Sequence, residues 1–119
     1  MGLSKGDIVL VPFPFTDLTR TKLRPAVVLW ADPHGSDVTL CFISSQNVAS
    51  VAAGEFVIDP SEAEFAGTKL KLTSKVRVTR IVTLERQLIQ RRLGKLGPNQ
   101  TQQLNTAVLQ AFQLAEPSI

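Results

Sequence analysis

The sequence predicts a mainly β fold, a small twisted barrel or sandwich with one helix at its C-terminal end. Short apolar or alternating runs recur along the chain, and clusters of Gly, Pro and Asp separate them at nearly regular spacing. Only the last part of the chain has a helical apolar period. A length of 119 residues suits one domain, residues 1–119, around a core that a partner subunit can help to complete.

Three strands are predicted in the first half of the chain. Residues 8–11 are apolar and mostly β-branched, and Pro12 and Pro14 are expected to prevent a continued central strand, because proline cannot donate to a central ladder. The nearly continuous apolar run 25–30 predicts burial on both faces. After the turn cluster "ADPHGSD", residues 38–43 form a third strand whose two faces alternate, and Cys41 is expected in the core.

The second half predicts further short strands. Residues 55–59 form a strand that Pro60 closes, and a helical turn is expected near 61–65. Residues 74–82 alternate, so that Val76 and Val78 point to one side and Lys75 and Arg77 to the other.

The chain is expected to end in a helix. Residues 83–89 suggest a short helical turn capped by Thr83, and residues 90–97 a short strand or extended connection. The helix covers residues 98–112, because Pro98 suits a first turn. Its apolar face is predicted to consist of Leu104, Val108, Ala111 and Phe112.

Composition limits the function without deciding it. The net charge of +3 favours polyanions such as RNA or DNA, although solvated lysines explain it equally well. One cysteine excludes an internal disulfide, and the lone His34 in a turn gives no metal site. GxSxG, GxGxxG and P-loop motifs are absent. No signal or membrane segment is apparent, so a cytoplasmic protein is expected, with no membrane contact.

Polar residues gather at the ends of two predicted strands. Arg24 precedes the run 25–30, and Ser44, Ser45 and Gln46 follow the strand 38–43. If these strands are neighbours, an arginine and a hydroxyl converge, and such a pair suits a phosphate. Spacing alone favours the alternative of a surface cation followed by a loop. Lys75, Arg77 and Arg80 add positive charge farther along the chain.

Four segments, in order, resemble the MazF/PemK family of toxin endoribonucleases from bacterial toxin–antitoxin modules. They are "KGDIVLVPFPF", "KLRPAVVLW", "CFISSQ" and "RVTRIVTLERQLIQRRLGKLGPNQTQQLNTAVLQAF". The resemblance implies a strongly twisted SH3-like barrel of the MazF/PemK/CcdB type and a homodimer. It also implies cleavage of single-stranded RNA, messenger RNA above all, without metal or cofactor. The implied antitoxin partner covers the RNA site with its C-terminal segment.

The resemblance also implies roles for individual residues. Arg24 matches the catalytic arginine and Ser44 the catalytic hydroxyl residue, with Ser45 in its place if the register shifts by one. Residues 16–22 match a mobile loop over the RNA groove, although this chain has no Gly or Glu between Pro12 and Arg24. The implied RNA-binding residues are Thr16, Asp17, Thr19, Arg20, Lys22, Gln46, Lys75, Arg77 and Arg80.

Other roles stay open. Asp7 and Asp17 are candidates to take the proton from the RNA 2′-hydroxyl, and Phe13 and Phe15 can either stack on bases or pack in the core. Two alternatives compete with the nuclease. One is a CcdB-like toxin that binds DNA gyrase without cutting RNA, and the other is a small-barrel binding module.

Overall fold

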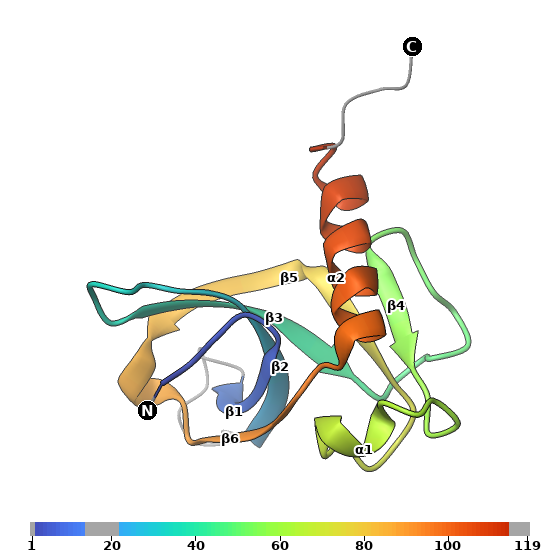
Figure 1. The fold of residues 1–119 in the computed structure, drawn as a ribbon, viewed down its shortest axis with the longest axis horizontal. Coiled ribbons are helices and arrows are strands. Elements are labelled where there is room, and N and C mark those ends of the chain that lie inside the picture. The colour runs from blue at the N-terminus through green and yellow to red at the C-terminus, as the bar shows by residue number, and fades with distance from the viewer. Residues whose placement is uncertain (1, 14–21, 115–119) are drawn as a thin grey trace.

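The strands and helices follow one another as the sequence pattern indicates (Figure 1). The computed structural model describes residues 2–13 and 22–114. The elements are β1 (Asp7–Phe13), β2 (Lys22–Ala31), β3 (Asp37–Ser44), β4 (Glu55–Ile58), α1 (Phe65–Thr68), β5 (Ser74–Glu85), the 3-10 turn η1 (Arg86–Leu88), β6 (Arg91–Lys95) and α2 (Pro98–Ala111).

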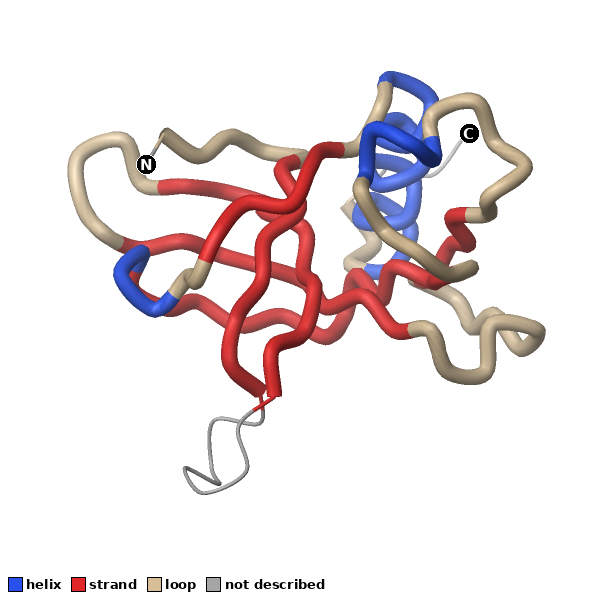
Figure 2. The backbone as a smooth tube through the Cα atoms, turned by 90° about the horizontal axis from the view of Figure 1, so that it is seen from below, coloured by secondary structure: helices blue, strands red, loops and turns tan. Residues whose placement is uncertain are grey.

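The six strands form one antiparallel sheet in the order β4-β5-β3-β2-β1-β6. The sheet curls into a half-barrel, and α2 lies over β4 and β5 at one end of it (Figures 1 and 2). The short α1 lies against β6. The predicted mainly β fold with a C-terminal helix is therefore confirmed.

Both faces of the curled sheet are buried. One core cluster joins Ile8, Val27 and Val76 to Leu104 of α2, and the other holds Val9, Val28 and their neighbours inside the curl. Ala26, Val27 and Val28 are consecutive and all fully buried, which confirms the predicted two-sided burial for the middle of the run 25–30. The prediction is wrong at the end of the run, where Trp30 is 49% exposed. The predicted core position of Cys41 is also confirmed.

Bulges bend the sheet. The ladder between β3 and β5 pairs Cys41 with Ile81 and then Phe42 with Arg77, so residues 78–80 of β5 have no partner on β3. The backbone N–H of Val78 instead donates to the carbonyl of Gly54, 2.9 Å away. Extra residues on one strand sharpen its twist, which helps a six-stranded sheet to curl around its core.

β1 continues through Pro12, but not as a central strand, in agreement with the prediction for this proline. β1 pairs with β6 only as far as Leu10, whereas it pairs with β2 as far as Phe13. Within the described residues, β1 is therefore an edge strand from Val11 onward, where proline is tolerated.

Some element boundaries differ from the prediction. β2 begins at Lys22, so Arg24 lies inside the strand instead of before it. The helical turn expected near 61–65 begins at Phe65. Thr83 does not cap η1, because it belongs to β5 and its hydroxyl hydrogen-bonds that of Thr39 at 2.7 Å. Phe112 is 43% exposed and does not complete the helix face.

Candidate active site

Arg24 and Ser44 occupy matching positions on neighbouring strands. The ladder between β2 and β3 pairs Ala26 with Phe42, and two residues farther along the two strands stand Arg24 and Ser44. Ser44 is in turn paired with Lys75 on β5. Directly paired residues point to the same side of a sheet, and alternation puts Arg24 on the side of Ala26 and Ser44 on the side of Phe42. One row across three strands therefore carries an arginine, a hydroxyl and an ammonium group, with Arg24 and Ser44 just beyond the last pair of the β2–β3 ladder.

The row belongs to the inner face of the curl. Arg24 pairs with Val11 of β1, and Val11 is part of the core cluster inside the curl. Alternation places Lys22, two residues before Arg24, on the same face. The hydrophobic cluster thus ends in a polar rim, to which β2 contributes the two cations Lys22 and Arg24. Both residues are exposed, so the rim is accessible to a ligand.

The hydroxyl of Ser44 is held by its own chain. Its Oγ accepts a hydrogen bond from the backbone N–H of Gln46 at 3.0 Å. A hydroxyl that accepts one bond still has its proton to donate. Ser45 and Gln46 are exposed and lie beyond the end of β3. Of the two serines, Ser44 is therefore the one that the sheet fixes in the same row as Arg24.

Lys75 and Arg77 share a carboxylate that the sequence reasoning missed. Glu55 of β4 lies 3.1 Å from the Lys75 ammonium and 2.9 Å from Nε of Arg77, and only 7% of its side chain is exposed. The backbone N–H of Ala52 donates to it at 2.9 Å. This bond, more than the two cations, holds the pKa of Glu55 below its ordinary value. The alternation of "EFVID" beside a basic strand was the only sequence signal for it.

This ion cluster changes what the two cations can do. Lys75 is only 7% exposed, and its ammonium also donates to the carbonyl of Ser50 at 2.9 Å. It is therefore not the open surface cation that the sequence suggested. Arg77, whose side chain is 34% exposed, keeps part of its guanidinium in solvent. A ligand at Ser44 would feel the buried charge of Lys75 only at a distance, without direct contact. The partly exposed guanidinium of Arg77 could contact the ligand directly.

Two aromatic rings flank the row of Arg24. Phe13 of β1 and Phe42 of β3 have ring centroids 5.0 Å apart at an interplanar angle of 53°, an ordinary tilted aromatic contact. Phe42 packs against the inner cluster, and Phe13 is 38% exposed. Phe13 thus packs on one side of its ring, while its exposed part leaves base stacking a prediction.

The other predicted residues are either exposed to solvent, distant from the row of Arg24, or outside the described residues. Arg80 is exposed in the β5 bulge, away from the paired row. Asp7 does not fit the role of the base. It is the first residue of β1, four residues before Val11, the partner of Arg24, and four residues of a strand span about 13 Å. His34 lies exposed in its turn. Thr16, Asp17, Thr19, Arg20 and Phe15 lie outside the described residues.

Within residues 2–13 and 22–114, no group of three His, Cys, Asp or Glu side chains could hold a metal ion. No helix in the same residues is long and apolar enough to cross a membrane.

The sequence model of a known family matches residues 4–112. It describes PemK-like, MazF-like toxins of type II toxin–antitoxin systems. The chain belongs to this family. No curated protein matches the sequence of this MazF-like toxin.

Solved structures agree with the MazF-like fold. An endoribonuclease in complex with its cognate antitoxin, from a mycobacterial species, superposes with a TM-score of 0.74 at 18% identity, covering 98% of this chain and all of that one. A second mycobacterial endoribonuclease gives 0.71 at 20% identity, over 98% and 97% of the two chains. The Mycobacterium tuberculosis toxin MazF-mt6 gives 0.70 at 25% identity, over 92% and 99%.

Proposed function

We propose that this MazF-like toxin is an endoribonuclease that cuts single-stranded RNA, messenger RNA above all, without a metal ion. The observation that carries the proposal is the row in which Arg24 and Ser44 stand side by side on β2 and β3. Family membership supports it, as do structural relatives that are themselves endoribonucleases. Residues 1–119 would form one toxin domain that acts in the cytoplasm as a homodimer.

The substrate brings its own nucleophile. The RNA 2′-oxygen attacks the adjacent phosphorus and loses its proton, the bond from phosphorus to the 5′-oxygen breaks, and that oxygen gains a proton. The products are a 2′,3′-cyclic phosphate and a 5′-hydroxyl. The protein has to align the attack and offset the negative charge that grows on the phosphate.

Arg24 and Ser44 suit these tasks. The guanidinium of Arg24 stays protonated, so it is no base, but it can donate two parallel hydrogen bonds to the non-bridging oxygens. Ser44 can donate its free proton to the phosphate or accept from the 2′-hydroxyl, while the N–H of Gln46 fixes its oxygen. Asp17, which the structure does not describe, remains the candidate to take the 2′-proton.

The surrounding charges would guide the RNA strand. Lys22, Arg77 and Arg80 would contact backbone phosphates, and the exposed part of Phe13 could stack on a base. A cognate antitoxin would inhibit the enzyme by laying a segment over this rim, in keeping with the relative whose structure includes its antitoxin.

The test compares four variants on a long single-stranded RNA in EDTA. Arg24→Ala and Ser44→Ala should each lower kcat by about 10²- to 10³-fold, the usual loss of one transition-state donor. Arg91→Ala, an exposed arginine on β6, and Ser45→Ala are the matched controls and should cut normally. Mapping of the cut ends should find a cyclic phosphate.

Undiminished cleavage by Arg24→Ala would refute the mechanism. Cleavage that stops in EDTA would indicate a metal nuclease instead. Loss of activity in Ser45→Ala alone would move the hydroxyl role by one residue. A wild-type protein that stalls DNA gyrase but leaves RNA whole would favour the CcdB-like alternative.

A further inference from the structure

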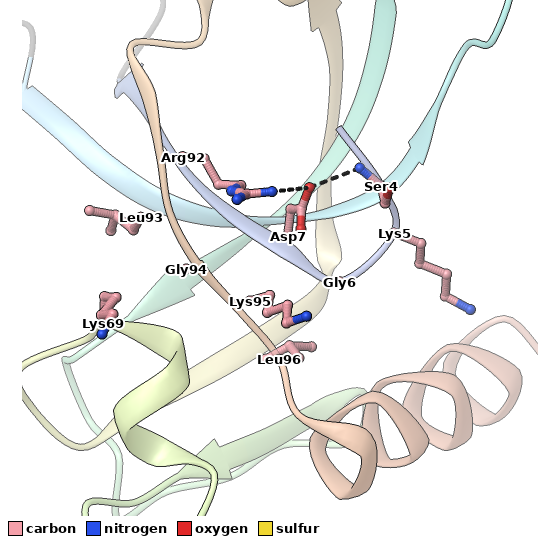
Figure 3. Close-up of a pocket in the computed structure, with 10 residues that line it drawn as sticks. All are labelled: Ser4, Lys5, Gly6, Asp7, Lys69, Arg92, Leu93, Gly94, Lys95 and Leu96. Carbon is pink, nitrogen blue, oxygen red and sulfur yellow. Dashed lines mark hydrogen bonds and ion pairs between the residues drawn. The ribbon is translucent and has the colours of Figure 1, made fainter. Parts of the chain in front are cut away.

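A basic cavity lies at the end of β1 that is far from Arg24. Its volume is ≈ 570 Å³, and it is enclosed by the N-terminal segment, the end of α1 and strand β6 (Figure 3). The charged side chains that line it are Lys5, Asp7, Lys69, Arg92 and Lys95. Four cations and a single carboxylate therefore line the cavity, with Lys69 on one side of β6 and Arg92 and Lys95 on the other (Figure 3).

That carboxylate is already engaged. Asp7 is 5% exposed, and its Oδ2 accepts from the backbone N–H of Ser4 at 2.9 Å and lies 3.7 Å from the guanidinium of Arg92 (Figure 3). Lys5 extends toward α2, where its ammonium donates to Asn105. Within the described residues, no carboxylate forms an ion pair with Lys69 or Lys95. Both lysines are exposed, so in this part of the chain their ammonium groups face solvent without a carboxylate partner.

The backbone fixes the walls of the cavity. Gly94 of β6 passes so close to α1 that a Cβ on it would lie 2.4 Å from the carbonyl oxygen of Gly67. Lys69 caps α1 in the left-handed conformation, at φ 61°, where glycine or asparagine is the usual choice. Such an unfavourable residue at a cap is a reason to look for a role of its side chain. The close packing of Gly94 brings this lysine beside β6.

The cavity is separate from the Arg24 row. Arg24 pairs with Val11, and Asp7 stands four residues away at the other end of β1, about 13 Å at strand rise. One phosphate group cannot reach both places, so the two sites bind different groups.

We propose that this cavity is a second anion site, which binds phosphate groups of a polyphosphorylated ligand through Lys69, Arg92 and Lys95. Arg92 is 53% exposed and can direct its remaining N–H groups at a phosphate while it keeps Asp7 as a neighbour. The two lysines add point charges with donors that rotate freely. The phosphates belong either to an RNA strand beyond the cut or to a free polyphosphorylated compound.

The first measurement is calorimetric binding of inorganic tripolyphosphate, which needs no catalysis and is therefore independent of the proposed nuclease activity. The site variant is Lys69→Ala with Lys95→Ala. The control is Lys71→Ala with Arg91→Ala, which removes two exposed cations of the same segments that do not line the cavity. The site variant should lose about tenfold or more in affinity, the equivalent of one charged hydrogen bond, and the control should not.

The second measurement identifies the source of the phosphates. The ligand is a 2′-O-methyl RNA strand of about 20 nucleotides, long enough to span both sites and without a hydroxyl that could attack. If RNA fills the cavity, the slope of log affinity against log salt falls by about 1.4 in the site variant only, because each phosphate contact of a single strand contributes about 0.7.

An unchanged RNA slope with weakened tripolyphosphate binding would assign the site to a free compound. Equal binding of both ligands by the wild type, the site variant and the control would overturn the proposal. Thermal unfolding of all three proteins under the same conditions verifies that each remains folded.

Discussion

Replacing Glu55 by glutamine should destabilise the protein far more than its size suggests. The carboxylate of Glu55 forms ion pairs with two cations and accepts a hydrogen bond from one backbone N–H, and the side chain is almost fully buried. Glutamine keeps one acceptor for the N–H of Ala52 but turns an amide NH₂ toward a cation. Arg77 can turn into solvent, whereas Lys75, at 7% exposure, cannot.

The expected cost follows from this uncompensated ammonium. Removing one partner of a buried ion pair costs about 3 kcal/mol at the lower end of measured cases, and the partial exposure of Arg77 places Glu55→Gln there. At an unfolding entropy of about 2.1 cal/mol/K per residue, the loss corresponds to a melting temperature about 12 °C lower for 119 residues.

The assay is thermal unfolding at one fixed protein concentration, since a homodimer would melt at a concentration-dependent temperature. The matched control is Glu85→Gln, an exposed glutamate at the end of β5. The double variant Glu55→Gln with Lys75→Met removes the buried charge as well, and it should regain most of the lost stability. If Glu55→Gln melts within about 2 °C of the control, or if the double variant is the least stable, Glu55 does not compensate a buried charge on Lys75.

Three further predictions concern other parts of the molecule. Because the pKa of Glu55 lies below its ordinary 4.5, its contribution to stability is complete above about pH 4.5 and is lost as the pH falls through the lowered pKa; acid titration of unfolding should show a flatter acid limb in Glu55→Gln than in the wild type. Gly94→Ala should cost about 1–3 kcal/mol in urea unfolding through its collision with α1, whereas Gly2→Ala, with nothing within 4 Å, should cost nothing measurable. Burial raises the pKa of the Cys41 thiol to about 12, so a disulfide reagent at pH 8 should label it only after unfolding; rapid labelling of the native protein would contradict the buried position.

The sequence predicted those features that depend on local patterns. Alternation in the strand of Val76 and Val78 and the apolar run 25–30 were sufficient to place their side chains, because burial on a sheet repeats every second residue. That Arg24 and Ser44 lie on the same face of neighbouring strands could only be suspected. It depends on the register between two strands, which spacing along the chain does not determine.

The failures have a common physical cause. The burial of Lys75 depends on Glu55, which lies on a different strand and is brought to it only by the β4–β5 ladder. Residues 78–80 of β5 have no partner on β3, and this bulge shifts Arg80 away from the row of Arg77. No local sequence motif predicts such a bulge. Asp7 lies at the opposite end of β1 from Val11, the partner of Arg24, and the sequence does not show which end of a strand faces the site.

The proline in β1 also determines how another chain can attach to this protein. Within the described residues, the ladder between β6 and β1 ends at Leu10, and Val11 and Pro12 follow it next to Arg24 on β2. The carbonyl of Leu10 accepts from Gln90 on the β6 side, and alternation turns the backbone of Pro12 to that same side. A peptide that paired with β1 as an additional strand would lack one hydrogen bond at Pro12, because proline has no backbone N–H to donate. An inhibitor segment that covers the rim of Arg24 must therefore be held by its side chains instead of by added strand pairing along β1.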